Sequence, residues 1–300
     1  MFRLFKASLA PSLEGLGGFL RSALFLCSAF GAGQTAYAQL EMRLETAQTS
    51  YLQYAPIPLT VTLKNLGGEV LELGDGNGQP WLEMIVQSMD GILLKPDRPF
   101  DAPRLTLQAG EFRALSMDLA PYFLIREPAG YRVRASARLA NGQTLLTEPL
   151  SLLLGRGEVI SSMPRGEGKE RRIFSLLKFY EDPNTGLYLR VEIPEQNLVF
   201  PALRLGSFVP LGKPTAEFDS KNHLHLLYNV GSGQYRLTVV NQDGQLLRQE
   251  TRRETFEKPK LAKNPDGMVE VLGGVVILPS HLREKLSTLQ ARGGTLPISH

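Results

Sequence analysis

Two histidines separated by one residue are the strongest candidates for metal chemistry in this 300-residue sequence. On a strand, His223 and His225 would point to the same face, where two imidazoles can reach one metal ion. Asp219 or Asp243 could supply a third ligand. The same alternation is explained if the intervening leucines pack inward and both histidines face solvent. We therefore expect no metal site.

A glycine-rich run at residues 74–78 has the composition of a calcium loop but not its ligands. A loop of the EF-hand type that began at Asp75 would need an oxygen ligand, a glycine and a bidentate glutamate where the sequence has Gln79, Pro80 and Val86. No Gly-Lys-Ser/Thr follows, as a phosphate-binding loop would require. The run predicts a loop between strands.

The candidate nucleophile and the paired acids stand in turn contexts. Ser232 lies between two glycines without the spacing of a nucleophile elbow. Glu181 with Asp182, and Glu217 with Asp219, are acid pairs that polysaccharide hydrolysis could use, but their turn contexts predict surface positions. We assign no catalytic, cofactor-binding or metal-binding residue and expect no cofactor.

Aromatic side chains could form a flat sugar-binding platform. Trp81 is the one tryptophan, and its apolar neighbours at a strand start favour a core or rim position. Tyr228 and Tyr235 flank the turn at residues 231–233. They could form an exposed aromatic pair or simply pack across two strands.

The elements that would position these residues begin after an export signal. Arg3 and Lys6 precede an apolar run at residues 23–30, and Ala36-Tyr37-Ala38 has the small-x-small pattern of signal peptidase sites. The apolar run is shorter than the roughly 20 residues of a spanning helix, so cleavage is favoured over an uncleaved membrane anchor. Leu26 stands before Cys27 where a lipoprotein would have a small residue. We expect an exported protein, periplasmic, extracellular or at the cell surface, with no transmembrane segment in its mature part.

Export would change the composition in two ways. Cys27 is the only cysteine, so residues 39–300 cannot form a disulfide and depend on core burial for stability. Residues 1–38 carry three basic side chains and one acidic one, so the formal net charge falls from +3 to +1 on cleavage. This balance argues against a nucleic-acid partner.

The first half of the exported part alternates with period two. Residues 40–45, 58–65 and 81–86 show this pattern, and Asp90-Gly91 and Asn141-Gly142 supply hairpin turns in which both central residues could take positive φ. About eight short strands in residues 39–155 favour a sandwich over a parallel α/β sheet.

Three segments also resemble the immunoglobulin-like β-sandwich domains of bacterial secreted proteins. These are the Pro-containing entry and strand at residues 54–65, Leu107-Gln108-Ala109-Gly110-Glu111, and the Pro-x-Gly-Tyr turn and strand at residues 128–135. The resemblance covers residues 40–155 and implies a fold. That fold hosts many unrelated functions.

A charged, glycine-rich stretch follows, and the β pattern then returns. Residues 158–169 predict a solvated linker, although Lys169-Glu170-Arg171-Arg172 could be a basic contact or processing site. Residues 222–252 are typical of three strands of a propeller blade. A closed propeller needs at least four blades of roughly 40 residues, so a small sandwich or open sheet is favoured for residues 170–279.

Taken together, the pattern predicts an all-β protein in five parts. They are a signal peptide (1–38), an immunoglobulin-like sandwich (39–157), a linker (158–169), a second β domain (170–279) and a C-terminal helix with its tail (280–300). The favoured function is a non-catalytic binding or structural module that contacts protein or glycan. A polysaccharide-active enzyme or accessory module, and a protease inhibitor that uses an exposed loop, stay open as alternatives.

Overall fold

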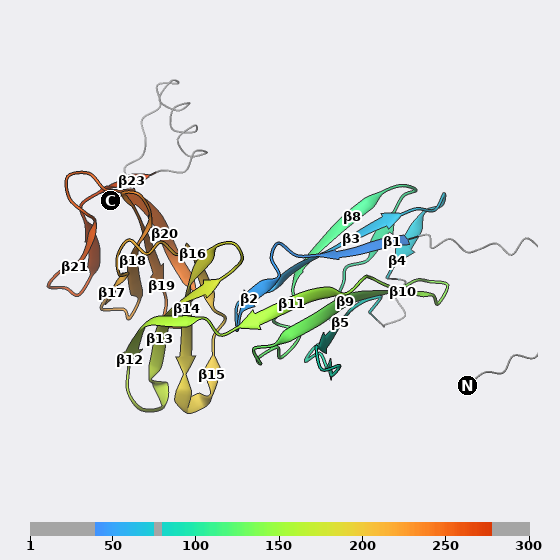
Figure 1. Cartoon of the computed structure of the whole chain (residues 1–300), viewed down its shortest axis with the longest axis horizontal. Helices are drawn as coiled ribbons and strands as arrows, with labels where there is room; N and C mark the ends of the chain where they lie inside the picture. Colours follow the sequence, from blue (N-terminus) through green and yellow to red (C-terminus); the bar gives the residue numbers. More distant parts are fainter. Residues whose placement is uncertain (1–39, 75–79, 278–300) are drawn as a thin grey trace, which may run out of the picture. The chain divides into compact units, whose positions relative to one another are not determined.

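The computed structural model describes residues 40–74 and 80–277, whose regular secondary structure is almost entirely β-strand (Figure 1). Helix is limited there to two short 3-10 turns, η1 (Gly168–Glu170) and η2 (Pro194–Gln196). The all-β class is confirmed. Among the described residues, no helix is long and apolar enough to cross a membrane. The predicted signal peptide (1–38), the glycine-rich run from Asp75 onward and the C-terminal helix (280–300) lie outside the described residues.

Residues 40–155 form three small sheets in this part of the chain, and their neighbouring strands are antiparallel except for β2 and β11. The first sheet has the order β1 (Leu40–Glu45), β3 (Pro58–Asn65), β8 (Phe112–Asp118). The second has the order β2 (Ser50–Leu52), β11 (Leu150–Gly155), β9 (Gly130–Arg138), β5 (Leu82–Ser88), β6 (Leu93–Leu94), and β10 (Thr144–Leu146) also pairs with β9. The third pairs β4 (Leu71–Leu73) with β7 (Leu105–Leu107).

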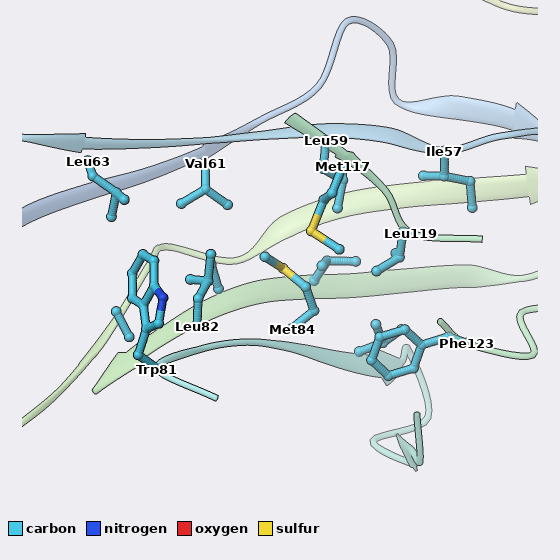
Figure 2. Packing of buried hydrophobic residues seen from close by; sticks show 14 of the residues in the cluster. Ile57, Leu59, Val61, Leu63, Trp81, Leu82, Met84, Met117, Leu119 and Phe123 are labelled. Carbon is cyan, nitrogen blue, oxygen red and sulfur yellow. The ribbon is translucent and has the colours of Figure 1, made fainter. Parts of the chain in front are cut away.

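One apolar cluster fills the space between these sheets. Alternate residues of β3 are buried, and Figure 2 shows Val61 and Leu63 pointing toward Leu82 and Trp81 on the opposite side. Met84, two residues after Leu82, points the same way because side chains on a strand alternate between faces. The period-two pattern in the sequence therefore predicted correctly which residues of these strands are buried.

The Asx-Gly hairpins form, but with a different turn from the one expected. Only the glycines take positive φ, 88° at Gly91 and 82° at Gly142. Each glycine N–H donates to the carbonyl three residues earlier, Gly91 to Ser88 at 3.0 Å and Gly142 to Leu139 at 2.9 Å. These are type I turns closed by a glycine bulge, so positive φ at both central residues was wrong. Asp90 and Asn141, directly before these glycines, do not take positive φ.

Residues 158–277 form three further antiparallel sheets. One contains β12 (Glu158–Arg165), β13 (Arg172–Tyr180), β14 (Thr185–Ile193) and β15 (Leu198–Val199), with β16 (Leu203–Ser207) also on β14. The next has the order β17 (Thr215–Phe218), β18 (Leu224–Gly231), β19 (Gln234–Val240), β20 (Leu246–Arg253), β23 (Val275–Ile277). The last pairs β21 (Lys260–Lys263) with β22 (Val269–Leu272).

The run from β17 to β20 is a four-stranded meander, the arrangement of a propeller blade. Its last three strands are the three predicted for residues 222–252. Residues of β18 and β19 join β13, β14 and β16 in a second buried cluster that includes Phe174, Leu189 and Leu226.

The linker predicted for residues 158–169 is wrong for most of its length. Glu158–Arg165 is strand β12, paired antiparallel with β13 from Glu158 opposite Lys178 to Arg165 opposite Arg172. Six of the eight side chains of β12 are exposed, because it is an edge strand, and the half-buried Ile160 and Met163 pack against the second buried cluster. Ile160 lies in a register shift, so the two residues are three positions apart and give no period-two signal.

Candidate functional site

The structure brings together the two histidines and one of the two aspartates considered for a metal. Asp219 is buried at the loop between β17 and β18, and its Oδ2 lies 3.3 Å from Nδ1 of His223 and 3.1 Å from Nε2 of His225. Its Oδ1 accepts the backbone N–H groups of Lys221 and His223, both at 2.9 Å. Asp243 is elsewhere and lies 3.3 Å from Arg172.

Hydrogen bonds explain the state of this carboxylate. Burial of Asp219 disfavours its charge, but the bonds from the His223 amide, the His225 ring and the Lys221 amide outweigh burial and lower its pKa. Across residues 40–74 and 80–277, no group of three His, Cys, Asp or Glu side chains is arranged to hold a metal ion. Asp219 acts as the cap of its loop and holds both imidazoles.

Glu181 was expected at the surface, and this is wrong. It is only 6% exposed. Arg204 on β16 donates two hydrogen bonds to its carboxylate, from Nε to Oε1 at 2.8 Å and from Nη2 to Oε2 at 2.6 Å. The Tyr188 hydroxyl also donates to Oε1. Gly186 lacks the Cβ that would overlap this carboxylate. Burial opposes ionisation, yet the bonds from Arg204 and Tyr188 lower the pKa of Glu181, while burial and the adjacent carboxylate raise the pKa of Tyr188.

The remaining acids of the predicted pairs have separate partners. Asp182 accepts the Tyr180 hydroxyl at 3.2 Å, and Glu217 lies 3.6 Å from the Lys263 ammonium. In each predicted pair one carboxylate is buried and held by several donors, and the other lies at a more exposed position with its own partner. Glu217 stands opposite His225 in the β17–β18 ladder.

The aromatic candidates and Ser232 take structural places. Trp81 is buried in the first cluster and donates from Nε1 to the Pro103 carbonyl at 3.1 Å, as a core or rim position predicts. Tyr228 is buried, donates to Leu205 at 2.8 Å and stands one position out of register with Tyr235, so the two point to opposite faces. An exposed tyrosine pair is therefore excluded. Ser232 lies in the turn between β18 and β19.

A different surface carries unused binding chemistry: the outward face of β11, β9 and β5, which we call the arginine face. Arg132 and Arg134 alternate on β9 with buried residues, so both project outward. Arg132 stands between Gln87 of β5 and Ser151 of β11, and Arg134 stands opposite Ile85. Figure 1 shows these three strands side by side.

The arginine face combines charge, a hollow and apolar side chains. Arg132 and Arg134 line a shallow hollow of about 140 Å³ together with Ile85, Gln87 and Pro149. Two leucines of the same face are exposed around it, Leu153 by 55% and Leu146 by 51%. Apolar side chains mixed with arginine are the composition enriched in the centres of protein interfaces.

The two guanidinium groups have no partner among residues 40–74 and 80–277. Other arginines are engaged there: Arg43 contacts Glu41 at 2.7 Å, and Arg113 contacts Glu111 at the same distance. Arg132 and Arg134 are instead exposed and line the hollow. A planar guanidinium can bind a carboxylate or phosphate with two parallel hydrogen bonds.

Sequence reasoning placed the strand that carries these arginines but not the site. The alternation of arginine with valine and alanine at residues 131–137 was the available signal. It marks a solvent-facing row of cations, but it cannot show whether carboxylates on neighbouring strands neutralise them. That depends on cross-strand register.

Comparison with known proteins gives weak fold likenesses alone. No protein-family model and no curated protein matches the chain. Among solved structures, a CARDB domain from Pyrococcus furiosus, described in complex with di-metal ions, is 16% identical over 39% of this chain and 87% of its own, with a TM-score of 0.25. A β-glucosidase from Listeria innocua matches at 16% identity over 40% of this chain and 17% of its own, with a TM-score of 0.25. A sporulation control protein from Bacillus subtilis matches at 10% identity over 57% of this chain and 91% of its own, with a TM-score of 0.28. These likenesses are too low to carry a functional argument.

Proposed function

We propose that this chain is an exported, non-catalytic binding module that contacts a protein or glycan in the periplasm or at the cell surface. The observation that carries the proposal is the arginine face. Arg132 and Arg134 are unpaired within the described residues and project from the middle strand of a regular sheet. A rigid strand holds such groups more precisely than a loop does.

The proposed partner carries anionic groups together with some apolar surface. Guanidinium groups favour carboxylate, phosphate or sulfate, and the exposed leucines around the hollow favour a partner that also buries apolar area. Long-range attraction between opposite charges would speed association and make it sensitive to salt.

The architecture proposed for this role is an immunoglobulin-like sandwich over residues 39–157. Its support is the single apolar cluster shared by the β1–β3–β8 sheet and the sheet centred on β9. A second β domain follows, and we place its start at β12. Export rests on the signal-peptide pattern in residues 1–38.

Capture from an extract of the cell envelope tests the proposal. The purified protein is immobilised, and retained proteins and glycans are identified by mass spectrometry. The double substitution Arg132→Gln with Arg134→Gln should reduce the retained partner on the order of tenfold, because two charge-assisted contacts are lost. Both residues are exposed, so stability should change by no more than about 0.5 kcal/mol.

The matched control replaces two other exposed basic residues, Arg253→Gln with Lys260→Gln, and removes the same charge from the second half of the chain. It should retain the partner like the wild type. If both double variants retain equally, or if the wild type recovers nothing specific, the proposal is wrong.

A further inference from the structure

Strand β8 is an open sheet edge of unusual regularity. Three edge strands in the described part of the chain have six or more residues: β1, β8 and β12. Edge strands of natural proteins are usually blunted by charge, proline or bulges, because their unpaired backbone groups can pair with another chain. β1 has three charged residues out of six, and β12 contains Pro164 and a register shift between Val159 and Ser161.

β8 has fewer of these protections: two of its seven residues, Arg113 and Asp118, are charged, and it has no bulge. It pairs with β3 over seven consecutive residues, from Pro58 opposite Asp118 to Lys64 opposite Phe112, without a register shift. It contains no proline and no lysine. Phe112 is 68% exposed, and Leu115 is only half-buried.

The ladder fixes which backbone groups of β8 face the open side. The Leu119 N–H donates to the Ile57 carbonyl at 3.0 Å, and the Asn65 N–H donates to the Glu111 carbonyl at 2.9 Å. Hydrogen-bonded pairs recur at every second residue of an antiparallel ladder, so the odd-numbered residues of β8 bond to β3. The N–H and C=O groups of Phe112, Ala114 and Ser116 therefore point away from β3.

We propose that β8 pairs antiparallel with β8 of a second copy of this chain, which joins two three-stranded sheets into one of six strands. Pairing about a two-fold axis at Leu115 puts Leu115 opposite Leu115 of the second copy, and Ala114 opposite Ser116 of the second copy. Ala114 and Ser116 are then hydrogen-bonded pairs, as their outward backbone groups require. The two Leu115 side chains fall in a non-hydrogen-bonded pair, where side chains across strands are closest.

Charge also favours this arrangement. Arg113 is already neutralised by Glu111 at 2.7 Å, which leaves Asp118 as the strand's remaining charge. The antiparallel register holds the two Asp118 residues roughly 20 Å apart along the ladder, six residues at about 3.3 Å each. Parallel pairing in register would place them side by side, where like charges destabilise a sheet.

The register also covers exposed apolar surface. Phe112 comes to lie diagonal to Ser116 of the second copy, within reach of a long side chain. A two-fold contact closes on itself, so it predicts a dimer rather than a filament. Because β8 belongs to a different sheet from the arginine face, the inference does not depend on the proposed function.

Sedimentation equilibrium of the purified protein over a range of micromolar concentrations tests this inference. The wild type should dimerise. Ala114→Pro removes an N–H that faces the open edge and bonds to nothing in β3, so it should raise the dimer dissociation constant at least tenfold while the fold is kept. Ala114→Val with Ser116→Thr is the control, since both changes keep the backbone donors and suit a strand, and it should dimerise like the wild type.

A second variant guards against a folding defect in Ala114→Pro. Ala114→Lys with Ser116→Lys keeps every backbone group and places lysines opposite lysines across the proposed contact, so it should be monomeric. A wild type that stays monomeric at all concentrations overturns the inference, and so does a lysine variant that dimerises as well as the wild type.

Discussion

The two regions of the chain, residues 40–155 and residues 158–277, both bury an apolar cluster between β-sheets but differ in their buried polar side chains. The buried polar side chains of the first region, Asn65 and Thr147, are uncharged. The second region buries two carboxylates, Glu181 and Asp219, each held by several donors. Both regions have an apolar cluster, but only the second couples its fold to the ionisation of buried groups.

This difference predicts a difference in acid stability. The pKa values of Glu181, Asp219 and Glu250 are all lowered in the folded protein, because hydrogen bonds and nearby cations outweigh the penalty of burial. A carboxyl group with a lowered folded pKa stabilises the protein above its unfolded pKa, and that contribution is lost as pH falls through the folded value. We expect the second region to weaken below about pH 4.5 before the first, since the unfolded value is about 4.5 for glutamate and 3.8 for aspartate.

The largest expected effect is a change that should not depend on pH. Leu63→Ala opens a cavity in the first apolar cluster and should lower the free energy of unfolding by about 2–5 kcal/mol. Urea unfolding followed by fluorescence reports on this region, because Trp81 is the only tryptophan and belongs to the same cluster. An equal loss at pH 7 and pH 4 is predicted. A loss of free energy that is smaller at pH 4 than at pH 7 would contradict the proposed difference between the two regions.

Glu181→Gln should cost about 2–3 kcal/mol at pH 7, because it removes the charge that Arg204 and Tyr188 bind in a buried site. The cost should diminish as the pH falls below about 4.5, because the unfolded chain then gains a proton that the folded carboxylate takes up only at lower pH. Hydrogen exchange of peptides from β13, β14 and β16 measures it region by region. Glu195→Gln, at an exposed site, is the control and should leave the stability of this region unchanged at both pH values.

Asn65→Ala should give the smallest of the three effects, about 1–2 kcal/mol. Its side-chain amide donates to the Glu69 carbonyl at 2.7 Å and the Leu107 carbonyl at 3.0 Å, and truncation leaves both acceptors without this donor. Because no charge is involved, the loss seen by tryptophan fluorescence should be the same at pH 7 and pH 4. A pH-dependent loss would show that the first region also depends on ionisation.

The sequence could predict elements whose signal is local. The strand of residues 58–65 and the Asx-Gly hairpins formed where alternation and turn chemistry placed them. β12 was missed because most of its side chains are exposed. Its two half-buried residues, Ile160 and Met163, lie three positions apart across a register shift, which hides the period-two signal.

The polar sites were harder because their partners are distant in sequence. Arg204 lies 23 residues after Glu181, so the buried ion pair depends on the register of β16 against β14. The Asp219–His225 contact spans only six residues around a turn, so the sequence could suggest Asp219 as a partner of the histidines. To predict the arginine face, one must know which residues of β11 and β5 stand opposite Arg132 and Arg134, and no local sequence pattern gives this register.

The claim that Arg132 and Arg134 make the partner contact can be tested most directly by covalent labelling. Arginine-specific labelling with phenylglyoxal, read by mass spectrometry, is compared for the free protein and for the protein loaded with its captured envelope partner. Arg132 and Arg134 should lose most of their labelling in the complex, while exposed Arg253 labels equally in both states. Equal labelling of Arg132 and Arg134 with and without the partner would contradict the account.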